Sequence, residues 1–251
     1  MPAPLSVRKN IELLTASELQ ALSDSYRRMQ LISDNRGFNY LAGFHGMPGK
    51  YCHTTKILFL PWHRAYLYTF EQALKDQAPS ATVPWWDWTS ALSHESGIPA
   101  AFAAATDSAG QPNPLLKSFI NVPSSVPPMA RDTQRVPGDP QTLPIPSYVT
   151  NLLGMQDFID FSNQVEDLHN RVHIWVGGDM EHVDYAAYDP LFYSHHAMID
   201  RIWYLWQIRQ GLNTIPHQLF EAVLQPFNLK VSDVLDVTKL GYEYAASQIV
   251  S

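Results

Sequence analysis

Residues 168–175 read LHNRVHIW and place His169 and His173 four positions apart. Side chains at positions i and i+4 of an α-helix leave the same face, so both imidazole rings can reach one metal ion. Asn170 stands where the His-Glu-x-x-His motif of zinc proteases has its glutamate, which argues against hydrolytic zinc chemistry. Two rings do not complete a metal site, so a third ligand must come from elsewhere in the chain.

Residues 189–203, DPLFYSHHAMIDRIW, offer that third ligand near the start of another predicted helix. Neighbouring residues on a helix diverge by about 100°, so His195 and His196 are not expected to face one ion together. One of the two is therefore expected to be a ligand, and the other to pack beside the site.

The first half of the chain has three candidate ligands of its own. His45 lies in FHGMP, His53 in YCHT and His63 in PWHR. Three neutral imidazoles for each ion, without carboxylates, suit copper or zinc better than the mixed Glu/His sets that bind di-iron in helical bundles. Redox copper is the leading interpretation.

Helical periodicity organises the chain around these histidines. Thr15 and Glu18 have the spacing of a capping box at the start of a helix. Apolar residues at helical intervals then predict helices over about 15–33, from about His63 with that histidine in the first turn, from about 156 through 172, and over 193–210.

The stretch from residue 93 to residue 147 has a different character, because nine prolines between positions 112 and 146 prevent long helices. We expect irregular surface loops there and a short docking segment over 231–244. The predicted fold class is mainly α: a helical bundle around a central metal site, with extensive proline-rich loops and few short strands. Residues 1–251 are expected to form a single domain, without a further C-terminal shielding domain.

Composition excludes several kinds of partner. A net charge of −7 and the absence of long basic runs argue against nucleic acid. The single cysteine, Cys52, excludes an intrachain disulfide, and no window approaches the roughly 18 apolar residues of a membrane span. We expect a soluble protein that is cytoplasmic, or exported without a signal peptide of its own.

Taken together, the motifs resemble the copper-binding motifs of tyrosinases and follow the family's order. The segments are FHGMP, FLPWHR (59–64), PWWDWT (84–89), HNRVH (169–173) and DPLF with the HHxxxDR that follows it. The resemblance extends over about residues 8–245. It implies two copper ions that use O2 as co-substrate, one held by His45, His53 and His63 and the other by His169, His173 and His196. His195 would then be a neighbour of the site.

The resemblance also suggests how a phenol could lose its proton. In tyrosinases that act on monophenols, an asparagine placed like Asn170 holds a water together with a nearby glutamate. Glu166 lies three residues before His169, on nearly the same helix face, and Asp167 is the competing acid. A solvated helix acid is the alternative interpretation of Glu166.

Four further residues receive roles by the same resemblance. Val183 falls at the family's gate position, and His182 is a candidate substrate contact, although both fit ordinary exposed loop residues too. Phe192 corresponds to an aromatic residue that packs on a ligand ring. Asp200, one turn after His196, is a candidate to orient a ligand ring, and the alternatives are a helix-surface acid or a partner of Arg201.

The sequence departs from the family pattern at Cys52. Many relatives link a cysteine to the middle ligand of the first copper by a thioether, but here Cys52 directly precedes His53 and the spacing to His63 is one residue longer. A buried, inert thiol is the favoured interpretation of Cys52. His53 remains the predicted ligand because no other histidine is near.

The predicted function is hydroxylation of monophenols to o-diphenols and oxidation of o-diphenols to o-quinones. One alternative is a catechol or o-aminophenol oxidase that lacks the first step, and a more distant one is an oxygen carrier that resembles haemocyanin. Small phenols are the expected partners, with a copper-delivery protein and a homo-oligomer left open.

Overall fold

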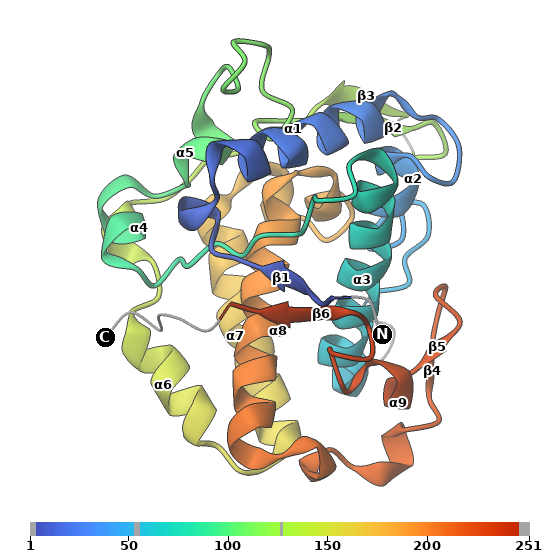
Figure 1. The fold of residues 1–251 in the computed structure, drawn as a ribbon, viewed down its shortest axis with the longest axis vertical. Helices are drawn as coiled ribbons and strands as arrows, with labels where there is room; N and C mark the ends of the chain where they lie inside the picture. Colours follow the sequence, from blue (N-terminus) through green and yellow to red (C-terminus); the bar gives the residue numbers. More distant parts are fainter. Residues whose placement is uncertain (1–3, 53–55, 126–127, 246–251) are drawn as a thin grey trace.

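The computed structural model describes residues 4–52, 56–125 and 128–245. Its centre is formed by three long helices: α3 (Phe59–Gln77), α7 (Phe158–Val176) and α8 (Leu191–Gln210). Helix α8 packs against both α3 and α7, and α1 (Ala16–Leu31) packs against α3 (Figure 1). The predicted fold class, a mainly helical protein with long loops and few short strands, is confirmed.

The remaining elements are short. The minor helices are α2 (Phe38–Ala42), α4 (Ala91–Ser96), α5 (Ala100–Ala103), α6 (Pro146–Gly154) and α9 (Val231–Val234). The strands pair as β1 (Ser6–Arg8) with β6 (Tyr242–Tyr244), β2 (Phe119–Val122) with β3 (Met129–Asp132), and β4 (Val223–Leu224) with β5 (Leu229–Lys230). Among the described residues, no helix has the length and apolar character that crossing a membrane requires.

The boundaries of two helices show how local sequence sets them. The capping box that begins α1 is present: the Thr15 hydroxyl accepts from the backbone N–H of Glu18, and the Glu18 carboxylate accepts from the backbone N–H of Thr15. Helix α3 begins at Phe59, four residues before its predicted start, because Pro61 fits the first turn of a helix, where its missing N–H costs no bond. His63 therefore lies beyond the first turn, and its predicted place there was wrong.

Helix α6 was also missed. Pro146 occupies its first position, which proline favours because its φ is already set for a helix. Over the described residues, the rest of the proline-rich stretch contains short elements, as predicted: α4, α5, the β2–β3 hairpin and the 3-10 turn Pro140–Thr142. Prolines that prevented long helices in this stretch thus also started a short one.

Aromatic side chains form much of the core where α1, α2, α3 and α8 meet. The rings of Phe70 and Tyr193 stack with centroids 3.5 Å apart, and Tyr26 and Phe38 pack around this pair. The Tyr66 hydroxyl donates to the carbonyl of Leu41 at 2.7 Å, which ties α3 to α2. Packing of this kind holds the long helices at fixed positions.

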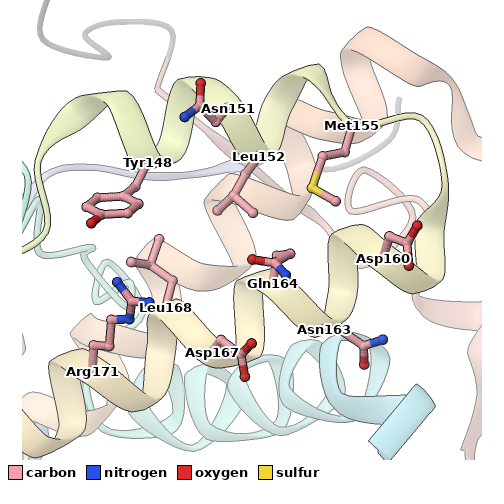
Figure 2. Close-up of a pocket in the computed structure, with 10 residues that line it drawn as sticks. All are labelled: Tyr148, Asn151, Leu152, Met155, Asp160, Asn163, Gln164, Asp167, Leu168 and Arg171. Atoms are coloured by element: carbon pink, nitrogen blue, oxygen red, sulfur yellow. The ribbon is translucent and has the colours of Figure 1, made fainter.

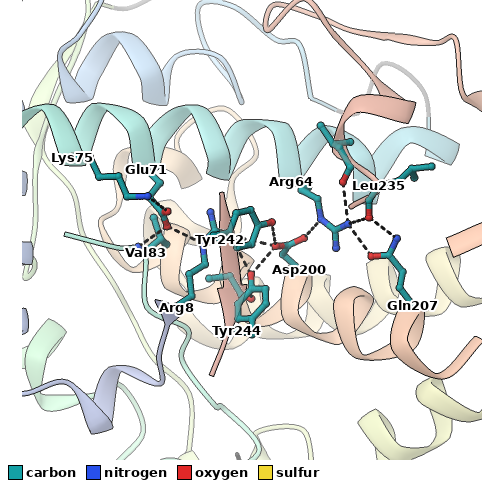
Figure 3. A network of polar contacts seen from close by, with 12 residues as sticks. Arg8, Arg64, Glu71, Lys75, Val83, Asp200, Gln207, Leu235, Tyr242 and Tyr244 are labelled. Carbon is teal, nitrogen blue, oxygen red and sulfur yellow. Dashed lines mark hydrogen bonds and ion pairs between the residues drawn. The ribbon is translucent and has the colours of Figure 1, made fainter. Parts of the chain in front are cut away.

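The C-terminal segment docks as predicted, because β6 pairs in parallel with β1 at the other end of the sequence. Arg8 of β1 is fully buried; its guanidinium lies 3.7 Å from the Tyr242 ring centroid and donates to Glu71 at 2.8 Å and to Asp200 at 3.2 Å (Figure 3). The two strands thereby reach the inner faces of α3 and α8.

Asp200 is the centre of this buried network. Its carboxylate accepts from Arg64 at 2.6 Å and from the hydroxyls of Tyr242 and Tyr244, each at 2.7 Å (Figure 3). Arg64 also donates to Gln207 at 2.8 Å. Buried charges are tolerated when they are paired and hydrogen-bonded in this way.

Candidate metal centre

Five of the six predicted ligand histidines lie within the described residues and gather at the centre of the helices. His63 comes from α3, His169 and His173 from α7, His196 from α8, and His45 from the turn after α2. All five are buried, the most exposed at 8%. The sixth, His53, lies outside the described residues.

The predicted ligands of the second copper, His169, His173 and His196, form the second trio. They converge through their Nε2 atoms. The Nε2 of His196 lies 3.1 Å from the Nε2 of His169 and 3.1 Å from that of His173. The two helices α7 and α8 therefore bring three imidazoles to a common point. This is the donor set that copper and zinc prefer.

Backbone carbonyls fix the tautomer of three of the rings. The Nδ1 atoms of His45, His63 and His173 lie 3.1, 2.8 and 2.6 Å from the carbonyl oxygens of Val183, Phe59 and Met180, respectively. A carbonyl only accepts, so each Nδ1 carries the proton and the lone pair of each Nε2 faces the cluster. Oriented, neutral rings of this kind are suited to bind a metal ion. The resemblance to tyrosinases implies that this ion is copper.

Burial also keeps the ring of His196 unprotonated. It lowers the pKa of His196 well below the ordinary value of 6.5, and the neighbouring imidazoles of His63 and His169 lower it further. At neutral pH the ring of His196 is therefore neutral and able to bind a metal ion.

His45 and His63, the described members of the first trio of predicted ligands, adjoin the second trio. The potential ligand atoms of His45, His63 and His196 lie within 4.8 Å of one another. The rings of His63 and His196 stack with centroids 4.4 Å apart. Cys52, which is buried, has its Sγ 3.4 Å from the Nε2 of His63. The two histidine groups thus form one continuous cluster.

His195 lies closer to this cluster than helix geometry suggested. Its ring stacks on that of His169 at 5.1 Å, and it offers a nitrogen within 4.8 Å of the ligand atoms of His169, His173 and His196. The expectation that the adjacent pair could not face one site together was therefore wrong, because both side chains bend toward α7. His196 still brings its Nε2 to 3.1 Å from the Nε2 atoms of both His169 and His173.

Two residues expected to support the rings behave differently. Phe192 stacks on His196 with centroids 3.9 Å apart and meets His45 edge-on at 4.8 Å. Among the described residues, Asp200 bonds neither a predicted ligand ring nor Arg201, and its contacts there belong to the network around Arg64. Arg201 lies over the ring of Trp85 instead. These predicted roles of Asp200 were wrong, because its partners lie far away in the sequence.

A cavity of about 270 Å³ opens onto the cluster. His45, His169 and His173 line it together with Asn170 and Val183. Val183 is 51% exposed at its rim, where the gate residue was expected. His182 is exposed and does not line the cavity. The sequence did not single out four other lining residues: Ile174, Met180, Glu181 and Ala186.

Both predicted base residues come from α7, and Asn170 is the one that lines the cavity. The Asn170 carboxamide oxygen lies 3.0 Å from the Nδ1 of His169, so it supports that ring. Glu166 is buried one turn earlier, and burial raises its pKa above the ordinary 4.5. Positions i and i+4 place Glu166 and Asn170 side by side on the helix surface.

The competing acid faces elsewhere. Asp167 lines a separate hollow of about 650 Å³ between α6 and α7, together with Tyr148, Asn163 and Arg171 (Figure 2). It therefore points away from the histidine cluster. Of the two acids, Glu166 is the one close to the site.

Comparison with known proteins agrees with the geometry. A family model described as "Common central domain of tyrosinase" matches residues 35–209. Hemocyanin G-type, units Oda to Odg, of Enteroctopus dofleini is 32% identical over 250 residues, which cover 88% of this chain but only 9% of that protein. The chain thus spans a small part of this much longer relative.

Solved structures show the same fold. A functional unit of octopus hemocyanin aligns with a TM-score of 0.81 at 29% identity, over 95% of this chain and 67% of the other. A tyrosinase from Burkholderia thailandensis aligns with a TM-score of 0.83 at 22% identity, over 98% and 75%. At that identity the second likeness shows the fold alone. With its histidine cluster and the match over residues 35–209, the chain belongs to the tyrosinase family of type-3 copper proteins.

Proposed function

We propose that this protein oxidises phenols with O2 at a centre of two copper ions. His45, His53 and His63 would hold one ion, and His169, His173 and His196 the other. The observation that carries the proposal is the cavity that opens from the surface onto rings of both trios. A substrate larger than O2 can approach the ligands through such an opening.

Copper at these rings would supply the electron transfers that reduce O2. A catechol gives up two electrons and two protons to become an o-quinone, and half an O2 becomes water. A monophenol uses a whole O2: one oxygen atom enters the ring, the other leaves as water, and the product is again the o-quinone.

The chain's own residues would handle the proton of a monophenol. Asn170 lines the cavity, and Glu166 is buried beside it with a pKa raised by burial. A general base works best when its pKa is near the working pH, so a raised carboxyl pKa favours this use. We assign Glu166 and Asn170 to hold the water that accepts the phenol proton.

The rim would position the aromatic ring. Ile174 and Val183 are 62% and 51% exposed at the cavity, and the carbonyl of Val183 is held by the Nδ1–H of His45. An apolar rim fixed to a ligand histidine can align a flat ring with the site. Apolar contact of this kind favours aromatic substrates.

Reversible O2 carriage is the second candidate function. It is supported by 32% identity to a hemocyanin, which exceeds the identity to the tyrosinase compared above. The same histidines would serve both functions. The difference would lie in whether a phenol reaches the copper.

One experiment separates the candidates. The copper-loaded protein is given 4-methylcatechol and then 4-methylphenol, and quinone formation and O2 consumption are measured. We expect both to be oxidised. Oxidation of the catechol alone would leave a catechol or o-aminophenol oxidase. Visible absorption that appears with O2 and disappears under argon, without quinone formation, would overturn the proposal in favour of a carrier. A His173→Leu variant controls for copper bound elsewhere.

A further inference from the structure

The mouth of the histidine cavity carries an acid that the proposed reaction does not use. Apart from the histidines, Glu181 is the one charged side chain among the described residues that line the cavity. The other lining residues near it, Met180, Val183 and Ile174, are apolar. The charge of Glu181 is therefore the main electrostatic feature that a ligand meets on entering.

Backbone contacts hold Glu181 in place. It ends the 3-10 turn Gly178–Glu181, directly after Met180, whose carbonyl accepts from the Nδ1–H of His173 at 2.6 Å. The turn is tied again at Asp179, whose carbonyl accepts from the backbone N–H of His182. Glu181 thus sits at a fixed place beside a predicted ligand.

The charge of Glu181 is not neutralised by its surroundings. Within the described part of the chain, its carboxylate has no ion-pair partner, and the side chain is exposed. The cations held by residues that flank Glu181 in the sequence already have partners: Lys50 lies 3.5 Å from Asp184, and Arg131 pairs with Asp179 at 2.5 Å. The mouth therefore keeps a net negative charge.

We infer that Glu181 makes the site select phenols with a cationic amine on the side chain over phenols with a carboxylate there. The inference rests on the proposed function. A cavity of about 270 Å³ lies below the roughly 300–1,000 Å³ of sites for drug-sized ligands, so it suits a single ring. With the phenolic oxygen toward the histidines, a para side chain extends to the mouth, where it meets Glu181.

The expected effect is modest because Glu181 is exposed. Pairs between exposed charges change an equilibrium by about two- to fivefold. Attraction to Glu181 would strengthen the binding of an amine, and repulsion would weaken the binding of a carboxylate. The two effects therefore multiply in the ratio of kcat/KM, or of affinity, between the two substrates. We expect a ratio effect of about fourfold or more at low salt, falling as salt screens the charges.

Three catechols with similar side chains test the inference: dopamine, 3-(3,4-dihydroxyphenyl)propionate and the neutral 4-ethylcatechol. The ratio of kcat/KM for the amine to that for the carboxylate is measured with the wild type, Glu181→Gln and Glu181→Lys. We expect the ratio to fall in the first variant and to fall further in the second. Glu95→Gln, which removes an exposed charge outside the cavity lining, should keep the wild-type ratio.

The dissociation constants of the amine and the carboxylate are also measured by calorimetry without O2, so the inference is tested even without turnover. If 4-ethylcatechol is not oxidised but the binding ratio depends on Glu181, the proposed function fails and the inference stands. An unchanged ratio in both Glu181 variants, or an equal change in Glu95→Gln, would overturn the inference.

Discussion

The guanidinium of Arg64 and the carboxylate of Asp200 lie 2.6 Å apart and join the two helices that carry His63 and His196. Arg64 directly follows His63 in α3, and Asp200 lies one turn after His196 in α8. The stacked rings of these two histidines, 4.4 Å apart, connect the two trios. The ion pair thus fixes the distance between helices on which the cluster depends.

Replacement of Asp200 by asparagine should destabilise the protein strongly. The change leaves Arg64 buried without its carboxylate partner, while Arg8 keeps Glu71, and breaking a buried pair in this way costs about 3–5 kcal/mol. Urea unfolding of the copper-free protein measures the loss. Asp132→Asn, at the exposed pair with Lys117, should cost less than about 1 kcal/mol. Equal losses in the two variants would contradict the importance of burial.

The same network predicts how stability depends on pH. Burial alone would raise the pKa of Asp200, but Arg64 and Arg8 outweigh burial and hold the pKa below the ordinary 3.8. Because the folded-state pKa is the lower one, the stabilisation is complete above pH 3.8 and is lost as the pH falls through the folded-state pKa. The free energy of unfolding, measured by circular dichroism, should therefore fall steeply below pH 3.8. Asp200→Asn should flatten this fall, and a variant that retained the full slope would exclude Asp200 as its source.

The two adjacent histidines should differ in copper binding. His196→Leu removes the ring whose Nε2 lies 3.1 Å from two other Nε2 atoms, so at least one copper equivalent should be lost. His195→Leu makes the same change at the neighbouring ring and should retain both equivalents. Metal analysis of the loaded, desalted proteins gives the counts. The reverse pattern would assign the ligand role to His195.

Asn170 should matter more for monophenols than for catechols. Asn170→Ala removes the carboxamide beside His169 and the proposed anchor of the water, so monophenol turnover should fall by about 10²-fold or more. Catechol turnover needs no comparable base and should fall less. The two rates are compared on 4-methylphenol and 4-methylcatechol. Equal losses would mean that Asn170 acts only through the ring of His169.

Glu166→Gln gives an independent test of the same water. It keeps the size of the side chain but removes the carboxylate that would hold the proton-accepting water, so monophenol turnover should fall by about 10²-fold while the copper content stays unchanged. Asp167→Asn is the matched control, because Asp167 faces the separate hollow between α6 and α7. A larger loss in the Asp167 variant would exchange the roles of the two acids.

Much of the fold could be predicted because its signals are local. The capping box of Thr15 and Glu18 depends on residues three apart, and it was found in the structure as expected. The start of α6 was not predicted because Pro146 counted among the prolines that prevent long helices, although proline also suits a first helical turn. The start of α3 differs because the apolar pattern from His63 onward does not show that Pro61 fits the first turn.

The candidate site likewise has parts that the sequence predicts and parts that it does not. The spacing of His169 and His173 predicted their shared face, and the structure places both rings at one point with His196. The partners of Asp200 could not be predicted, because Arg8 lies 192 positions away in the sequence. The bonds from His45 and His173 to the carbonyls of Val183 and Met180 could not be predicted for another reason. Every residue has a backbone carbonyl, so residue identity does not reveal which one accepts a bond.

The bond between Arg8 and Tyr244 also constrains when the buried network can form during translation. The two residues lie 236 positions apart, and a ribosome adds about 5–20 residues per second. Arg8 is therefore made more than about ten seconds before its tyrosine partners. Until residues 242–244 have emerged, the charges that join α3 and α8 lack their full set of contacts. The contacts that hold α3 and α8 beside each other are thus completed only after residues 242–244 have emerged, so stable copper binding should follow the synthesis of this segment.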